Sequence, residues 1–386
     1  MGKLVLAALV GIVGIALWLL PLFSSGSLPK MDPNAWWGPM ELKGKVDNSI
    51  KPFKVKFSDE LIKDLRYRLK NHRKLAPPLE GVVREFYEAI PLLTKQNPGY
   101  DFAFEVIVPS LPGYGFSDPA VHPGLGPGEI GMIFKNLMNR LGFEKFYIQG
   151  GDWGAVIASA MATLFQDEVL GHHNNMMVIM TTGAYLRMFI GAYIPSLIIE
   201  SDLWDRMYPL TKYFGHYVEE LGYLHLQATK PDTVGVALTD SPVGLLTYML
   251  EKFGAWTRME HRLLPDNGIT RDFSRDQLID NLMVYWTANC VTSSMRLYAE
   301  VLGNRNRELY LDGYSTKVPS WGLQPRHELY YQPPNILKLK YTNLLGVTVL
   351  DDGGHFFAFQ KPQLFAKDVY KAVNEFIAWH KRKTEL

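Results

Sequence analysis

The chain has 386 residues, of which 47% are hydrophobic, and a formal net charge of +1 at pH 7. This length and composition suffice for one large core with an inserted subdomain, and the near-neutral charge excludes a general attraction to nucleic acid. The single cysteine, Cys290, excludes an intramolecular disulfide framework, and no Cys-x-x-Cys or similar spacing indicates a metal site. We therefore expect no metal and no other cofactor.

Residues 4–23 are uncharged and almost wholly apolar. About twenty such residues span the core of a bilayer, whereas the apolar region of a cleaved signal peptide is usually only ~7–15 residues long. The length favours a retained anchor over residues 1–30 that contacts membrane lipid, although the Ser-Ser-Gly sequence at 24–26 could serve as a cleavage site. Lys3 and Lys30 nearly balance, so the charge leaves the orientation open.

An N-terminal extension over residues 31–82 follows the expected anchor. Within it, residues 59–71 place apolar side chains at helical spacing between charges, so we predict an amphipathic surface helix. Trp36 and Trp37 stand near the expected anchor, where tryptophans often lie at the membrane interface. They could equally pack onto the domain that follows.

Residues 83–176 alternate between helix-like and strand-like segments. We predict helices at 84–93, 129–141 and 155–165, and buried strands at 104–108 and 146–149. An alternation of strands and helices is typical of a parallel sheet with crossover helices, which is an α/β fold.

Residues 177–310 change in pattern and become mostly helical, rich in Met, Tyr, Phe and Leu. We interpret them as a helical lid inserted into the α/β core. Stripes of aromatic residues are more often core packing than a ligand pocket, but a lid over an apolar pocket is the usual place where substrate shape is recognised. The α/β order returns over 311–386, with strands predicted at 318–323 and 347–350 and a closing helix at 366–380.

Residues 150–154 have the sequence Gly-Gly-Asp-Trp-Gly and stand between a predicted strand and a predicted helix. Glycines permit the sharp turn of a nucleophile elbow, which exposes the central side chain above the sheet and in front of the N–H groups of the new helix. The central residue here is Asp152. A carboxylate in this place acts as a direct nucleophile and forms an ester that must later be hydrolysed.

Hydrolysis of such an ester requires a base. His355 is the natural candidate because it follows two glycines at the end of a predicted strand. The order nucleophile, acid, histidine is that of α/β-hydrolases, and Glu328, near the end of the preceding predicted strand, fits the orienting acid. Asp351 and Asp352 are rival acids, but they stand too close in sequence to His355 to approach its ring easily from behind.

Several segments distributed over residues 36–386 resemble the microsomal-type epoxide hydrolases, and within this family its insect juvenile hormone branch. The matching segments lie at 36–39 (Trp-Trp-Gly-Pro), 77–81 (Pro-Pro-Leu-Glu-Gly), 109–117, 147–154, 222–232, 241–245, 296–298 and 353–356 (Gly-Gly-His-Phe). The resemblance implies an α/β-hydrolase fold and an enzyme that adds water to an apolar epoxide, juvenile hormone-like or xenobiotic, to give a diol. It also implies a single-pass anchor in the endoplasmic reticulum membrane.

The resemblance implies a role for each matching site residue. Asp152 would be the nucleophile, His355 the base and Glu328 its partner. Tyr223 and Tyr298 would be lid tyrosines that protonate the opening epoxide oxygen. Without the resemblance, either tyrosine would be interpreted as a buried aromatic residue with a satisfied hydroxyl.

The backbone N–H of Trp153 would be one donor of the oxyanion hole during ester hydrolysis. The family completes this hole with a His-Gly-x-Pro segment, and the chain lacks one, because residues 80–82 run straight into residues 83–85. We therefore expect a sheet that is incomplete at its N-terminal strands. Two other functions stay open: an impaired or inactive truncated form that only binds lipid-like ligands, and a haloalkane dehalogenase, which shares the Gly-x-Asp-x-Gly pattern. The oligomeric state also stays open.

Overall fold

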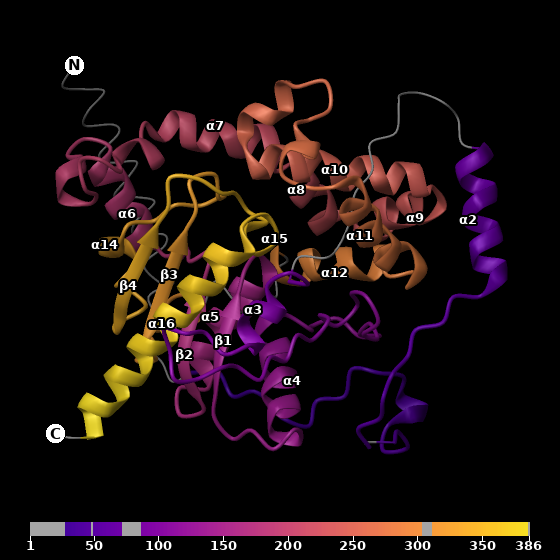
Figure 1. The fold of residues 1–386 in the computed structure, drawn as a ribbon, viewed down its shortest axis with the longest axis horizontal. Helices are drawn as coiled ribbons and strands as arrows, with labels where there is room; N and C mark the ends of the chain where they lie inside the picture. Colours follow the sequence, from indigo (N-terminus) through magenta and orange to yellow (C-terminus); the bar gives the residue numbers. More distant parts are fainter. Residues whose placement is uncertain (1–27, 48, 72–85, 303–310, 385–386) are drawn as a thin grey trace.

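A computed structural model describes residues 28–47, 49–71, 86–302 and 311–384 (Figure 1). At its centre lies a parallel sheet in which the order of the strands is β1-β2-β3-β4. The strands are β1 (Phe146–Gly150), β2 (Val169–Asn174), β3 (Ser320–Gln324) and β4 (Leu344–Val349). The predicted α/β fold with a parallel sheet is therefore confirmed, and three of its strands coincide with predicted ones.

Helices cover both faces of this sheet. On one face lie α4 (Pro127–Arg140) and α5 (Trp153–Leu164), and on the other α3 (Ile90–Thr94) and the long α16 (Pro362–Thr384), which crosses the sheet in Figure 1. Successive residues of a strand face opposite sides of the sheet, so β2 contacts the helices of both layers. A Cβ atom on Gly171 would lie 2.2 Å from the Phe376 ring of α16, whereas Asn174 Nδ2 donates a hydrogen bond to the Ala155 carbonyl of α5 at 3.1 Å.

Strand β2 was not among the predicted strands. Its sequence, Val-Leu-Gly-His-His-Asn, lacks the continuous apolar run of a buried strand, yet His172 and His173 are 0% and 1% exposed. Polar partners compensate their burial, since His173 Nε2 lies 3.1 Å from Asp368 Oδ2 and His172 Nε2 lies 3.2 Å from Asn174 Nδ2. Burial lowers the pKa of His172 to about 3, so this strand carries a neutral imidazole into the core.

The predicted strand at 104–108 is wrong. This segment is extended but pairs with no strand in the described part of the chain, because the position beside the free edge of β1 is not occupied by a described strand. It is held instead by packing on α16, where the rings of Phe104 and Tyr370 lie 4.8 Å apart. Of the helix predicted at 84–93, the described residues form turns at 86–89 and enter α3 only at Ile90.

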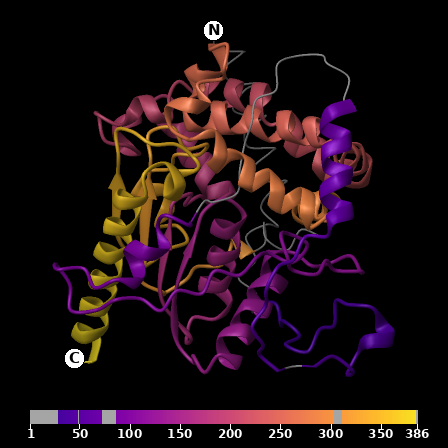
Figure 2. The same ribbon diagram turned by 45° about the vertical axis from the view of Figure 1, so that its right-hand side comes forward.

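A layer of helices lies above the carboxyl ends of the strands (Figures 1 and 2). It comprises α6 (Thr182–Gly191), α7 (Leu210–Glu220), α8 (Gly222–Thr229), α9 (Pro231–Asp240), α10 (Pro242–Thr257), α11 (Arg275–Thr287) and α12 (Val291–Leu302). The short helices α14 (Pro334–Leu337) and α15 (Phe357–Gln360) connect the later strands to the rest. The helical pattern read from the sequence over 177–302 is thus present in the structure.

Helix α2 (Asp59–Asn71) stands at the outside of this layer and contacts α10. No residue of α2 is buried, as the prediction of a surface helix requires. Arg68 attaches it to the layer, since its Nη1 lies 2.9 Å from Asp240 Oδ1 and its guanidinium lies 5.9 Å from the Trp286 ring centroid.

The expected anchor at 4–23 lies outside the described residues. Among the helices that the structure does describe, none is both long enough and apolar enough to cross a bilayer. The segment that follows lies against α4, where Asn136 Nδ2 donates a hydrogen bond to the Pro33 carbonyl at 2.9 Å. Trp37 packs beside this core, and its carbonyl accepts a hydrogen bond from the Val121 N–H at 2.9 Å. Of the two interpretations of Trp37, the structure supports packing onto the domain.

Candidate active site

The turn between β1 and α5 places Asp152 at the start of the helix. Asp152 has φ +47° and ψ −127°, a positive φ that side chains other than glycine rarely adopt. The neighbouring glycines make the turn possible: a Cβ atom on Gly150 would lie 2.1 Å from the Gly154 carbonyl oxygen, and one on Gly151 would lie 2.7 Å from Asn175 Nδ2. The chain therefore forms the tight strand-to-helix turn that the spacing of its glycines predicts.

His355 links Asp152 to Glu328. His355 Nε2 lies 3.1 Å from Asp152 Oδ2, and His355 Nδ1 lies 2.7 Å from Glu328 Oε1. The side chains of His355 and Glu328 are 4% and 2% exposed, and Glu328 Oε1 also accepts the Leu329 N–H at 2.7 Å. A parallel bridge between His327 and Gly354 holds the two loops side by side.

The two rival acids lie elsewhere. Asp351 Oδ1 is 3.4 Å from Arg206 Nη2, and Asp352 Oδ1 is 2.7 Å from Arg258 Nη2, so both carboxylates are engaged away from the His355 ring. Of the three acids considered from the sequence, the structure brings only Glu328 to the imidazole.

The contacts within this group shift the pKa values of Asp152 and His355. Burial alone would raise the pKa of Asp152, but its hydrogen bond and charge interaction with His355, together with the Trp153 backbone N–H, outweigh burial and hold the pKa below its usual value. Burial would lower the pKa of His355, but Glu328 and Asp152 outweigh it and hold the pKa well above 6.5. Near neutral pH, the resting site is therefore an imidazolium between two carboxylates.

Tyr223 on α8 and Tyr298 on α12 face the same cavity as Asp152, which has a volume of about 1060 Å³. Their ring centroids lie 5.9 Å apart, and the Tyr298 ring meets the Trp153 ring edge-on at 4.8 Å. Burial, together with the charge of Asp152, raises the pKa of both hydroxyls well above 10. Both tyrosines therefore carry their protons at neutral pH and can donate hydrogen bonds.

The structure adds two residues that were not predicted from the sequence. The Trp256 ring lies 5.1 Å from both the His355 and the Tyr223 rings, and the Trp256 carbonyl accepts the His355 backbone N–H at 2.9 Å. Gln227 is 5% exposed and lines the cavity beside Tyr298. No local motif marks Trp256, but Gln227 stands one helical turn after Tyr223, a spacing that could have identified it.

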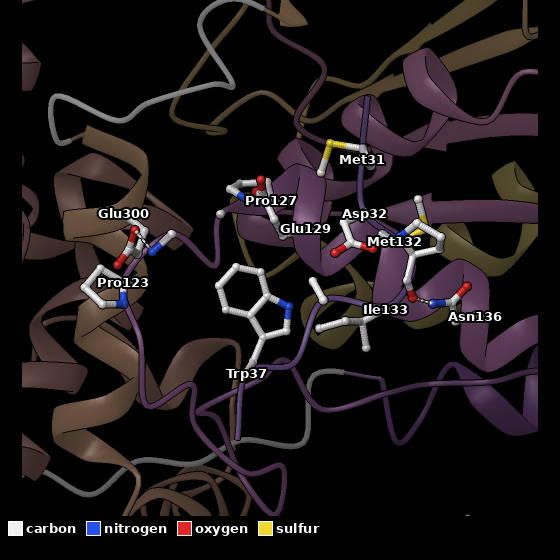
Figure 3. A pocket seen from close by; sticks show the side chains of 14 residues that line it. Met31, Asp32, Trp37, Pro123, Pro127, Glu129, Met132, Ile133, Asn136 and Glu300 are labelled. Carbon is white, nitrogen blue, oxygen red and sulfur yellow. Dashed lines mark hydrogen bonds between the residues drawn. The ribbon is translucent and has the colours of Figure 1, made fainter. Parts of the chain in front are cut away.

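A second cavity of about 550 Å³ lies between α4 and the segment around Trp37 (Figure 3). Glu129 and Glu300 line it, and Glu300 Oε2 accepts the Gly124 N–H at 2.8 Å. None of the predicted site residues lines this cavity. Within the described residues, no group of three or more His, Cys, Asp or Glu side chains could hold a metal ion.

Comparisons with known proteins agree with this geometry. The family described as "alpha/beta hydrolase fold" matches residues 78–187. The chain is 46% identical to a juvenile hormone epoxide hydrolase of Bombyx mori, over 97% of each chain, and 36% identical to epoxide hydrolase 1 of Sus scrofa, over 88% of this chain and 92% of the relative.

Solved structures extend the comparison. The crystal structure of the juvenile hormone epoxide hydrolase from the silkworm Bombyx mori superposes with a TM-score of 0.88 at 45% identity, covering 91% of this chain and 100% of that one. An epoxide hydrolase of Aspergillus niger shares the fold, with a TM-score of 0.65 at 20% identity over 85% of this chain and 97% of that one.

The sequence alignment with the Bombyx mori relative is longer than this chain. It spans 448 positions, 62 more than the 386 residues of this chain, so at least that many positions of the relative have no counterpart here. The identity and the coverage nevertheless leave no ambiguity of ancestry. The chain belongs to the microsomal-type epoxide hydrolase family.

Proposed function

We propose that the protein hydrolyses apolar epoxides to diols through an ester on Asp152. The observation that carries this proposal is His355 hydrogen-bonded between Asp152 and Glu328, at a cavity that also holds the protonated tyrosines Tyr223 and Tyr298. A nucleophile without a removable proton, a base that the neighbouring carboxylates keep protonated, and two proton donors suit ring opening followed by ester hydrolysis.

In the first step, the Asp152 carboxylate attacks one carbon of the epoxide. The bond between that carbon and the ring oxygen breaks, and the oxygen takes up a proton from Tyr223 or Tyr298. The imidazolium of His355 holds the attacking carboxylate in place. The products are an ester on Asp152, a free hydroxyl on the neighbouring carbon and a tyrosinate.

The second step follows from the loss of charge on Asp152. Ester formation removes one of the two carboxylates that hold the pKa of His355 high, so the imidazolium can pass its proton on and restore the tyrosine. Neutral His355 then takes a proton from water, and the hydroxide adds to the ester carbonyl carbon. The Trp153 N–H, which contacts the free carboxylate, would stabilise the resulting oxyanion.

Collapse of this intermediate completes the cycle. The bond from the carbonyl carbon to the ester oxygen that carries the substrate breaks, so this former Asp152 oxygen leaves with the diol, which takes the proton back from His355. The acid form of Asp152 then returns its own proton to His355, which restores the resting ion pair.

A single turnover in H2¹⁸O tests this route. With enzyme in excess over epoxide, the diol should contain no ¹⁸O, because its new oxygen comes from the Asp152 carboxylate, and a peptide containing Asp152 should gain the label. Label in the first-turnover diol would instead indicate direct attack of water on the epoxide and would refute the ester.

The cavity and the relatives suggest the class of substrate. The residues around Asp152 are mostly apolar or aromatic, which favours hydrocarbon-rich epoxides. We propose juvenile hormone-like or xenobiotic epoxides, an anchor over 1–30 in the endoplasmic reticulum membrane, and a lid over 177–310 between core segments 83–176 and 311–386. Retention in carbonate-washed microsomes by the full chain, but not by a form lacking residues 1–30, would support the anchor.

A second candidate is an impaired form that only binds lipid-like ligands. Two observations favour it: positions of the Bombyx mori relative have no counterpart here, and the segment at 104–108 pairs with no described strand. It predicts binding of an apolar epoxide without diol formation. A haloalkane dehalogenase is the third, and chloride release from a chlorinated alkane would be its signature.

A further inference from the structure

Gln227 is a buried amide that the proposed mechanism does not yet use. It lies on α8 one helical turn after Tyr223, so the two side chains project from the same face of the helix. The face is directed into the cavity, which both residues line together with Tyr298 of the neighbouring α12. A buried amide needs hydrogen-bond partners for its oxygen and its nitrogen, and these partners determine how it is oriented.

Tyr248 on α10 supplies the partner on one side. Its hydroxyl donates to Gln227 Oε1 at 3.0 Å, so the carbonyl oxygen of the amide is already engaged by a side chain of α10. The NH2 group is then the end of the amide that can donate to the Tyr298 hydroxyl, and both residues line the same cavity. Burial and the charge of Asp152 raise the pKa of Tyr298, and interactions with polar neighbours that include Gln227 and Tyr223 oppose this rise.

We propose that Gln227 is a positioning residue that sets the direction of the Tyr298 hydroxyl: its NH2 donates to the Tyr298 oxygen, which leaves the Tyr298 proton free for the epoxide oxygen. This proposal rests on the proposed epoxide hydrolysis. Tyr248 is part of the same device, because only the amide orientation that it selects presents a donor to Tyr298.

The orientation of the Gln227 amide determines whether the Tyr298 proton is available to the substrate. If the carbonyl oxygen of Gln227 faced Tyr298, it would accept the Tyr298 proton and hold it away from the substrate. A hydrogen bond accepted by the phenol oxygen also favours its ionised form, so the proposed orientation makes Tyr298 a better proton donor. Such contacts tighten when the substrate enters.

Three substitutions separate these effects. Gln227→Leu removes the donor, Gln227→Glu replaces it with an acceptor, and Tyr248→Phe frees the amide to turn. His225→Ala, an exposed change on the same helix, is the matched control. Single-turnover rates of ester formation and of ester hydrolysis are measured separately by rapid quench, and thermal unfolding checks that each variant is folded.

We expect Gln227→Leu to slow ester formation about 10-fold, the effect of one well-oriented hydrogen bond, and to leave ester hydrolysis unchanged. Gln227→Glu should slow it further, and Tyr248→Phe less. In a Tyr298→Phe background, Gln227→Leu should have no additional effect. An equal loss in both steps, or a loss that persists without the Tyr298 hydroxyl, would overturn the proposal.

A second measurement does not require turnover. With ¹³Cζ-labelled tyrosine, Gln227→Leu should shift the Tyr298 resonance of the ligand-free protein, Tyr248→Phe should shift it in part, and His225→Ala should leave it in place. An unchanged Tyr298 resonance in Gln227→Leu would overturn the proposal even if no diol forms. A shifted resonance in a protein that makes no diol would leave the contact intact and reject only the proposed function.

Discussion

His355→Gln should convert the protein into a trap for its own intermediate. The substitution removes the base that activates water, and general bases typically contribute ~10²–10⁴ in rate. Ester hydrolysis should therefore slow by that factor. Asp152 loses the partner that lowers its pKa, but its side chain is 43% exposed and keeps the Trp153 backbone N–H, so we expect it to remain ionised at pH 7. Ester formation should consequently continue.

Glutamine is chosen because of Glu328. This carboxylate is 2% exposed and depends on His355 Nδ1 at 2.7 Å, and leaving a buried charge without its partner typically costs about 3–5 kcal/mol. The amide of glutamine offers an N–H donor of similar reach, whereas alanine offers none. We expect His355→Gln to stay folded and His355→Ala to unfold at a clearly lower temperature.

The assay is the mass of the intact protein after exposure to an apolar epoxide. Since ring opening by a carboxylate is an addition, the mass should rise by that of one whole epoxide, and peptide mapping should place the adduct on Asp152. The double variant with Asp152→Asn is the control and should gain no mass. A folded His355→Gln protein that binds the epoxide but gains no mass, or gains it on another residue, would refute the reasoning.

Three further predictions follow from the geometry. The value of kcat should fall with decreasing pH through the pKa of His355 in the ester state, because ester hydrolysis needs the neutral imidazole. The value of kcat/KM should persist to lower pH, down to the lowered pKa of Asp152, because ester formation needs only the ionised carboxylate. A pH-rate study in which both parameters fall at the same pH on the acid side would contradict this. Tyr298→Phe should slow ester formation by ~10²–10³ in single-turnover experiments without slowing ester hydrolysis, since the hydroxyl acts only on the opening ring. Arg68→Ala should lower the free energy of unfolding in urea by less than about 1 kcal/mol, because the side chains of Arg68 and Asp240 are 34% and 83% exposed, and a larger loss would show that α2 is integral to the fold.

The elbow could be predicted from the sequence because its requirements are local. The turn leaves no room for a Cβ atom at Gly150 or Gly151, so the glycines before Asp152 mark the elbow without knowledge of the rest of the chain. Glu328 could be favoured over Asp351 and Asp352 because a residue only three or four positions before His355 cannot easily reach behind its ring. The roles of these residues stay predictions until they are measured.

Features that depend on distant partners could not be predicted in this way. Strand β2 has a polar sequence, and the burial of His172 and His173 depends on their contacts with Asn174 and Asp368. A hydrophobic pattern in the sequence does not reveal such partners. The segment at 104–108 has the apolar, β-branched sequence of a buried strand, but strand structure also needs a neighbour, and that neighbour is not among the described residues. Trp256 reaches the site through tertiary packing alone.

The positive φ of Asp152 destabilises the folded chain, whereas its carboxylate is needed for the proposed reaction. A non-glycine residue held at φ +47° and ψ −127° costs of the order of 1–3 kcal/mol, which the packing of α5 against β1 must offset. Glycine at this position would relieve the strain, so Asp152→Gly should yield a protein that is harder to melt and chemically inert. A population of sequences selected for robustness alone would drift toward that glycine, and only selection for turnover retains the acid.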